Sequence, residues 1–167
     1  HHICGMASFI SVINKLNESY GSYHCGFYEC RTSEVLDRVE RGLDDLGIIF
    51  FTEHSKGQMI QELRNRGIIF NHIVYQTAHA YICQNHPLAS SQEINIEEMI
   101  QYPFISYDRS PDTNPAYTDL IIPNYQVKKI IHVSDRAASY SAMRYCHGFA
   151  IGSGYKSFDS NYSDIIS

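Results

Sequence analysis

Apolar residues in the first part of the chain change between helical spacing and short extended runs. Apolar residues three or four positions apart predict three helices, which contain Phe9–Leu16, Val35–Leu43 and Met59–Leu63. Extended runs predict three strands, at His2–Gly5, Tyr23–Cys30 and Leu46–Phe51. Strands that alternate with helices are typical of a parallel sheet with right-handed crossovers. We therefore expect this part of the chain to form one α/β lobe.

The second part of the chain begins with an unusually long extended run, Phe70–Gln84, which we expect to cross between two lobes. The pattern restarts after Pro87. It predicts three strands, at Phe104–Tyr107, Lys129–Val133 and Phe149–Ile151. It also predicts a helix capped by Asn95, with Glu98 at the capping-box position, and a helix over Asp135–His147 with Ser134 as its N-cap and Gly148 as its stop signal.

These elements predict an α/β fold with two Rossmann-like lobes joined by crossover strands. We expect the first lobe and its crossover strand to span residues 1–78, and the second lobe to span residues 79–155. Residues 156–167 are expected to return toward the first lobe. Because no further elements follow Tyr155, we expect the C-terminal part of the fold to be incomplete.

Composition and charge are those of an ordinary soluble domain, with 44% hydrophobic and 19% charged residues. The longest apolar run, Leu46–Phe51, is far shorter than the roughly 20 residues of a membrane span. A net charge of −5 offers no basic surface for nucleic acid. Five cysteines without paired spacing favour a reducing cytoplasm. We therefore expect neither a membrane-spanning segment nor direct binding of nucleic acid.

Chemistry-bearing residues do not form a catalytic or metal-binding pattern. His72, His79 and His86 recur at odd spacing, which places neighbours on opposite faces of an extended strand, so they cannot converge on a metal. None of the cysteines has a local base, although Cys4 and Cys30 near predicted strand ends leave a redox role open. The paired acids Asp44 and Asp45 are interpreted as structural. We expect no cofactor, no metal and no enzymatic activity.

Three segments form an ordered pattern along nearly the whole chain. The first is Val35–Phe50, with the sequence VLDRVERGLDDLGIIF. The second is the long extended run that ends in HPLA at His86–Ala89, followed by YPFI at Tyr102–Ile105. The third is Val133-Ser134-Asp135 with its helix and the strand that follows it. In this order and spacing the chain resembles the effector-binding domain of LysR-type transcriptional regulators.

The resemblance implies a periplasmic-binding-protein-like (type 2) fold that holds a small-molecule effector in the cleft between the lobes, with an anion as one candidate. It implies a bacterial, cytoplasmic regulator in which the effector shifts the populations of the conformational states of the domain, without catalysis. It also implies a homodimer through the first-lobe helix, about Ser8–Leu16, and the second-lobe helix, about Arg136–Tyr145. DNA would be bound only through a helix-turn-helix domain that is absent from this sequence.

Candidate ligand contacts lie at the strand-to-helix turns, because parallel strands end at one edge of a sheet and helix N-termini there present free N–H groups. In the first lobe the candidates are Ala7, Ser8, Phe9, Arg31, Thr32, Ser33 and Thr52. In the second lobe they are Ser106, Tyr107, Ser134, Asp135, Arg136 and Gly152. The family resemblance points to the same turns, and Ser8 stands where family members often place a ligand-contacting hydroxyl.

Alternatives remain open for these residues and for the function. Thr32, Ser33 and Ser134 are also suitable helix N-caps. Arg31, Arg109 and Arg136 suit a carboxylate or phosphate, but arginines are more often solvated or ion-paired. A solute-binding protein of a transport system shares the two-lobed design. An enzyme built on the same lobes would need a convergent acid, base or nucleophile at the strand ends.

Overall fold

The computed structural model describes residues 3–107, 117, 127–154 and 162–167. The chain divides into two compact units, of which unit 1 comprises residues 1–71 and 114–117, and unit 2 comprises residues 72–113 and 118–167. Helices and strands are both present, so the chain is a mixed α/β protein, as predicted. Within the described ranges, no helix combines the length and apolar character needed to cross a membrane.

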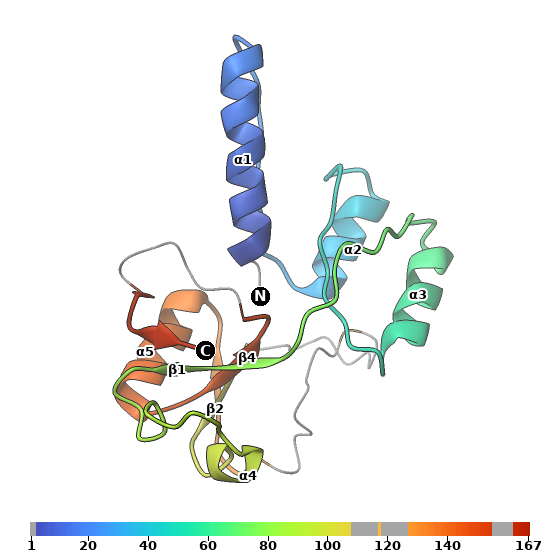
Figure 1. The fold of residues 1–167 in the computed structure, drawn as a ribbon. Coiled ribbons are helices and arrows are strands. Elements are labelled where there is room, and N and C mark those ends of the chain that lie inside the picture. Colours follow the sequence, from blue (N-terminus) through green and yellow to red (C-terminus); the bar gives the residue numbers. More distant parts are fainter. Residues whose placement is uncertain (1–2, 108–116, 118–126, 155–161) are drawn as a thin grey trace. The chain divides into compact units, whose positions relative to one another are not determined.

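The described part of unit 1 contains three helices (Figure 1), α1 over Ile3–Ser19, α2 over Thr32–Glu40 and α3 over Lys56–Asn65. Its core is a cluster of three buried side chains, Leu36 from α2 and Met59 and Leu63 from α3. All three residues belong to the helically spaced apolar sets from which these helices were predicted. A helix that buries one face needs apolar residues three or four positions apart. The predicted helices around them are confirmed, except that α2 ends at Glu40 and Leu43 lies outside it.

The strands predicted in this part of the chain are wrong, because the described residues of unit 1 contain no strand. Residues 3–5 belong to α1. The segments Tyr23–Cys30 and Leu46–Phe51 form no ladder with a described strand, and their apolar side chains pack on helices instead. Phe51 packs against the core cluster, and the Phe27 ring lies 5.4 Å from that of Phe9 in α1. An extended run that covers helices has the same composition as a strand, since both present a half-buried apolar surface.

Arg66, directly after α3, links α3 to α2. Its guanidinium donates to Glu62 of α3 at 2.7 Å, to Glu40 of α2 at 2.9 Å, and also to Asp37 of α2. The hydrogen bond from Arg66, and a second from the Tyr117 hydroxyl, lower the pKa of Glu62. In the same unit Arg38 forms a bidentate pair with Asp44, which agrees with the structural interpretation of that acid.

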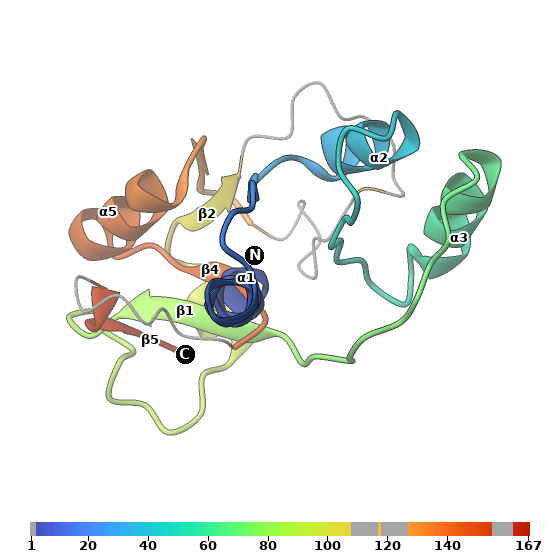
Figure 2. The ribbon, with the colours of Figure 1, turned by 90° about the horizontal axis from the view of Figure 1, so that it is seen from above.

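Unit 2 contains five short strands and two helices (Figures 1 and 2) in its described part. The strands are β1 (His79–Cys83), β2 (Phe104–Tyr107), β3 (Ile130–Val133), β4 (Ala150–Gly152) and β5 (Ile165–Ile166). The helices are α4 (Ile96–Met99) and α5 (Arg136–Cys146). β2 and β3 are parallel, whereas β1 lies between β4 and β5 and is antiparallel to both.

Backbone contacts at Phe149 join these two groups of strands. The Ile105 N–H donates to the Phe149 carbonyl at 2.8 Å, and the Phe149 N–H donates to the Pro103 carbonyl at 2.9 Å. The resulting bridge between Phe104 and Phe149 is parallel. The strands of unit 2 therefore follow the order β3–β2–β4–β1–β5, with β1 running opposite to the others.

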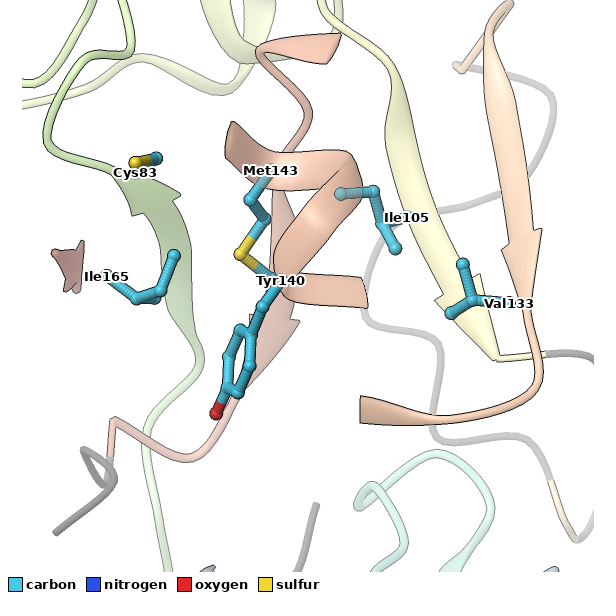
Figure 3. Close-up of a cluster of buried hydrophobic side chains, with 6 residues drawn as sticks. All are labelled: Cys83, Ile105, Val133, Tyr140, Met143 and Ile165. Carbon is cyan, nitrogen blue, oxygen red and sulfur yellow. The ribbon is translucent and has the colours of Figure 1, made fainter. Parts of the chain in front are cut away.

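Both faces of this sheet are buried, because neighbouring residues along a strand point to opposite sides. Phe104 and Phe149 belong to one apolar cluster, which also contains Met99 of α4. The adjacent Ile105 belongs to the other cluster, which α5 covers with Tyr140 and Met143. Figure 3 shows these two side chains between Cys83 and Ile165 on one side and Ile105 and Val133 on the other.

The strand predictions for unit 2 hold at β2 and, within one residue, at β3 and β4. The long run Phe70–Gln84 forms a ladder only over His79–Cys83, because its partners β4 and β5 are short. Asn95 caps α4 as predicted by accepting the Glu97 N–H at 3.1 Å. Helix α5 departs from prediction at both ends: Asp135 is its N-cap in place of Ser134, and the left-handed residue that ends it is His147, before Gly148.

We predict that Phe149→Ala destabilises unit 2 by roughly 3–5 kcal/mol, because it empties a fully buried ring site at the junction of the strands. Tyr145→Ala is the matched control, since this aromatic side chain is 83% exposed and its loss should change stability by less than about 0.5 kcal/mol. Urea unfolding followed by circular dichroism measures both. Equal effects of the two substitutions would contradict the assigned core.

The buried imidazole of His86 makes the stability of unit 2 dependent on pH. Its Nδ1 accepts the Leu88 N–H at 3.1 Å, so Nδ1 carries no proton in the folded state. Burial lowers the pKa of His86 below its ordinary value. Protonation therefore costs the Leu88 hydrogen bond and buries a charge. Stability from the neutral ring is fully present above about pH 6.5, the pKa of an unfolded histidine, and is lost as pH falls through the lower folded value.

We predict that the free energy of unfolding of the unsubstituted protein decreases more steeply below about pH 6.5 than that of His86→Asn, whose amide oxygen can replace Nδ1 as acceptor without titrating. Unfolding by urea at a series of pH values tests this. His54→Asn, at an exposed histidine of unit 1, serves as the control and should retain the steep dependence. Parallel curves for the protein and His86→Asn would overturn the assignment.

Candidate functional site

Three parallel strands of unit 2 end at one edge of the sheet. β2 ends at Tyr107, β3 at Val133 and β4 at Gly152. Since β1 is antiparallel to β4, its first residue, His79, pairs with Gly152 at this same edge. Open α/β sheets bind ligands beyond the carboxyl ends of their strands. We call this region the carboxyl edge and define it by Thr77, His79, Ser106, Tyr107, Ser134, Asp135, Arg136, Gly152, Ser153 and Gly154.

Helix α5 begins at the carboxyl edge and is capped there by a carboxylate. The side chain of Asp135 accepts the Ala138 N–H at 2.9 Å and the Ser134 hydroxyl at 3.1 Å. These contacts, the backbone one first, lower the pKa of Asp135. The exposed Asp135 therefore stays ionised at neutral pH and places a negative charge at the N-terminus of α5.

The imidazole of His79, the first residue of β1, packs against the backbone just after β4. Nε2 of His79 shares a hydrogen bond of 3.0 Å with the Thr77 hydroxyl. Gly154, with φ +81°, lies so close that a Cβ there would stand 2.7 Å from His79 Cδ2. Glycine is therefore required both by the backbone conformation and by the approach of the ring. Sequence reasoning missed Thr77 and His79 because only the antiparallel register of β1 brings them to this edge. Gly154 follows β4 directly, and its role depends on its contact with the His79 ring.

The remaining residues of the carboxyl edge differ in exposure. Ser106 is buried, and its hydroxyl lies 3.4 Å from the Tyr107 carbonyl, at the long limit of a hydrogen bond. Tyr107, Arg136, Gly152 and Ser153 are half-buried. A Cβ on Gly152 would lie 2.6 Å from the Tyr81 ring, so packing within the sheet accounts for this glycine. The edge thus contains mainly hydroxyl groups, together with one imidazole, one carboxylate and the guanidinium of Arg136.

The candidates predicted in the first lobe are not gathered at a sheet edge, because unit 1 has no strand among its described residues. Ala7, Ser8 and Phe9 lie inside α1 and not in a turn before it. Arg31 occupies the N-cap position of α2, followed by Thr32 and Ser33, and no side chain caps this helix. Thr52 belongs to a turn in which its N–H donates to the Ser55 hydroxyl at 3.2 Å. Arg109 and its neighbour Asp108 lie outside the described residues.

Two of the cysteines, Cys30 and Cys83, have a raised pKa. Cys83 is buried, its thiol donates to Asp164, and burial raises its pKa. Burial, followed by the charge of Glu34, raises the pKa of Cys30 as well. Both thiols are therefore less ionised than an ordinary cysteine. In the part of the chain that the structure describes, no three His, Cys, Asp or Glu side chains are placed to hold a metal ion.

No protein-family model matches the chain. No curated protein matches it either. A solved structure described as the effector binding domain of QuiR in complex with shikimate is similar at a TM-score of 0.43 and 14% sequence identity, covering 82% of this chain and 73% of that chain. Similarity at this level does not establish a shared fold.

We predict that Asp135→Ala destabilises unit 2 by about 1 kcal/mol through loss of the α5 cap, whereas Asp135→Asn keeps most of that stability. Asparagine retains an oxygen that can accept the Ala138 N–H. Thermal unfolding at neutral pH distinguishes the two variants. Equal destabilisation by both substitutions would mean that the charge of Asp135, and not its hydrogen bond to Ala138, stabilises the helix.

Proposed function

We propose that the chain is a ligand-sensing domain of the LysR effector-binding type, and that unit 2 binds a small molecule at its carboxyl edge. The observation that carries this proposal is the convergence of β2, β3 and β4 with the start of the antiparallel β1. This arrangement supports a hydrogen-bonding site assembled from four separate segments. The three sequence segments that resemble LysR-type domains support the assignment of type.

The chemistry of the edge supports binding without turnover. The Asp135 carboxylate is occupied by the cap of α5, and the His79 imidazole is hydrogen-bonded to Thr77. A hydroxyl nucleophile needs a base that is held in place by a third group. The Ser134 hydroxyl donates to the capping carboxylate, and the Thr77 hydroxyl pairs with His79, whose ring has no described carboxylate partner to orient it. We therefore propose that these groups orient a ligand and do not react with it.

The regulatory role extends the same proposal. Ligand binding would shift the population of states of the domain, and so the geometry of a homodimer formed through α1 and α5. DNA would be contacted by a separate helix-turn-helix domain, in the cytoplasm of a bacterium. The net charge of −5 agrees with this division of labour, because an acidic domain gains nothing from a phosphate backbone.

We predict that a metabolite screen by thermal shift identifies a compound that raises the Tm, because a ligand that binds only the folded state stabilises it. The effect should weaken in His79→Gln and in Ser134→Ala. Ser134→Ala removes a hydroxyl, and His79→Gln replaces the rigid imidazole with a flexible amide. Each change is expected to cost about 1 kcal/mol of binding, which corresponds to roughly a fivefold weaker affinity.

Ser163→Ala is the matched control for Ser134→Ala. Ser163 is also an exposed serine of unit 2, but it precedes β5, whose Ile165 pairs with Cys83 at the opposite edge of the sheet. The control should bind like the unsubstituted protein. A compound whose affinity is unchanged in His79→Gln and Ser134→Ala would place the binding site elsewhere, and the absence of any hit would count against the sensor function itself.

A further inference from the structure

Gln76 is buried within a segment that leaves its apolar residues exposed. Every other residue from His72 to His79 is exposed, and Ile73 and Val74 are 78% and 53% exposed. Gln76 alone in this segment is half-buried. Burial favours an apolar side chain and costs a polar one free energy. The stability of the fold therefore does not account for which side chain this segment buries.

Both polar atoms of the Gln76 side chain are enclosed and unpaired. Oε1 and Nε2 are shielded from solvent, and neither has a hydrogen-bond partner in the protein. A buried donor or acceptor without a partner costs free energy, and here one side chain carries both. Within the described ranges, the other buried side chain with an unpaired polar atom is His86, through a single nitrogen. Gln76 thus offers a donor and an acceptor that the protein itself does not use.

The position of Gln76 in the chain is next to the carboxyl edge. It directly precedes Thr77, whose hydroxyl shares a hydrogen bond of 3.0 Å with Nε2 of His79. The antiparallel register of β1 places His79 opposite Gly152, where β4 ends. Consecutive Cα atoms lie about 3.8 Å apart, so the backbone of Gln76 adjoins the groups that we propose to bind a ligand.

A carboxamide is fully paired only by a group that both donates and accepts. A carboxylate can accept from Nε2 but leaves Oε1 unpaired, and an ammonium group can donate to Oε1 but leaves Nε2 unpaired. A second amide pairs both atoms at once. Since an unpaired buried atom is costly, the difference between these ligands should be measurable.

We propose that Gln76 is a ligand-recognition residue of the carboxyl edge, and that it selects a small molecule with an amide or another group that presents a donor beside an acceptor. This inference rests on the proposed function and narrows its ligand class. The enclosed amide would be the specificity-determining contact, because the hydroxyl groups of the edge can pair with donors and acceptors alike.

Two sets of probes that share a skeleton and differ in one group test the inference. They are benzamide, benzoate and benzylamine, and lactamide, lactate and 1-amino-2-propanol. Titration into the ¹⁵N-labelled chain is followed by NMR, through the side-chain amide signal of Gln76 and the backbone signals of residues 152–154. The loss of one signal in Gln76→Met assigns the side-chain amide. We expect the amide of a set to bind about tenfold more tightly than the other members, a ratio that corresponds to about 1.4 kcal/mol.

Gln76→Met keeps the length of the side chain and removes both polar atoms, so it should reduce this ratio to within about twofold. It should not lower the Tm of the protein alone, because it removes atoms that have no partner. Gln84→Met is the matched control. Gln84 is exposed and follows β1 at its other end, so this substitution should leave the ratio unchanged.

The outcomes separate the inference from the proposed function. A lower Tm of Gln76→Met would mean that the amide serves the fold, and would overturn the recognition role. Equal affinity of the members of each set, with shifts at residues 152–154, would also overturn that role and leave the proposed function standing. If none of the six probes shifts Gln76 or residues 152–154, the edge is not a ligand site and both proposals are wrong.

Discussion

Two backbone hydrogen bonds at Phe149 hold the carboxyl edge together. They join β2 and β3 to the three strands around β1, and without them the polar ends of the strands would belong to separate sheets. The join is protected because Phe149 is fully buried and its ring lies 5.3 Å from that of Phe104. A buried backbone group without a partner is costly, so this pair of bonds also fixes the register of β4 beside β2.

The sequence predicted much of unit 2 and less of unit 1, for one physical reason. Runs such as Phe104–Tyr107 are buried on both faces, and continuous apolar composition identifies them as strands. Leu46–Phe51 has similar composition but lies over α2 and α3, where apolar packing does not require a ladder. Periodicity reports which residues are buried, and it does not report whether a helix or a strand provides the cover.

The sequence predicted those residues of the candidate site that directly follow a strand along the chain. Ser106, Tyr107, Ser134, Asp135, Arg136 and Gly152 follow or end predicted strands, and the structure places them at one edge. His79 and Thr77 were not predictable, because the reversed direction of β1 is a property of the assembled sheet. The sequence placed the cap of this helix one residue too early, at Ser134, whereas the carboxylate of Asp135 caps α5.

The position of β1 constrains the order in which unit 2 can form. β1 is the first strand of this unit in the chain, yet both of its neighbours, β4 and β5, come from the last part. The stretch Ile68–Gln92 around it contains no charged residue. During synthesis this uncharged, apolar strand emerges long before either partner exists, and pairings between distant parts of a chain form slowly. Until β4 and β5 have been made, the unpaired edges of β1 are open to pairing with another molecule.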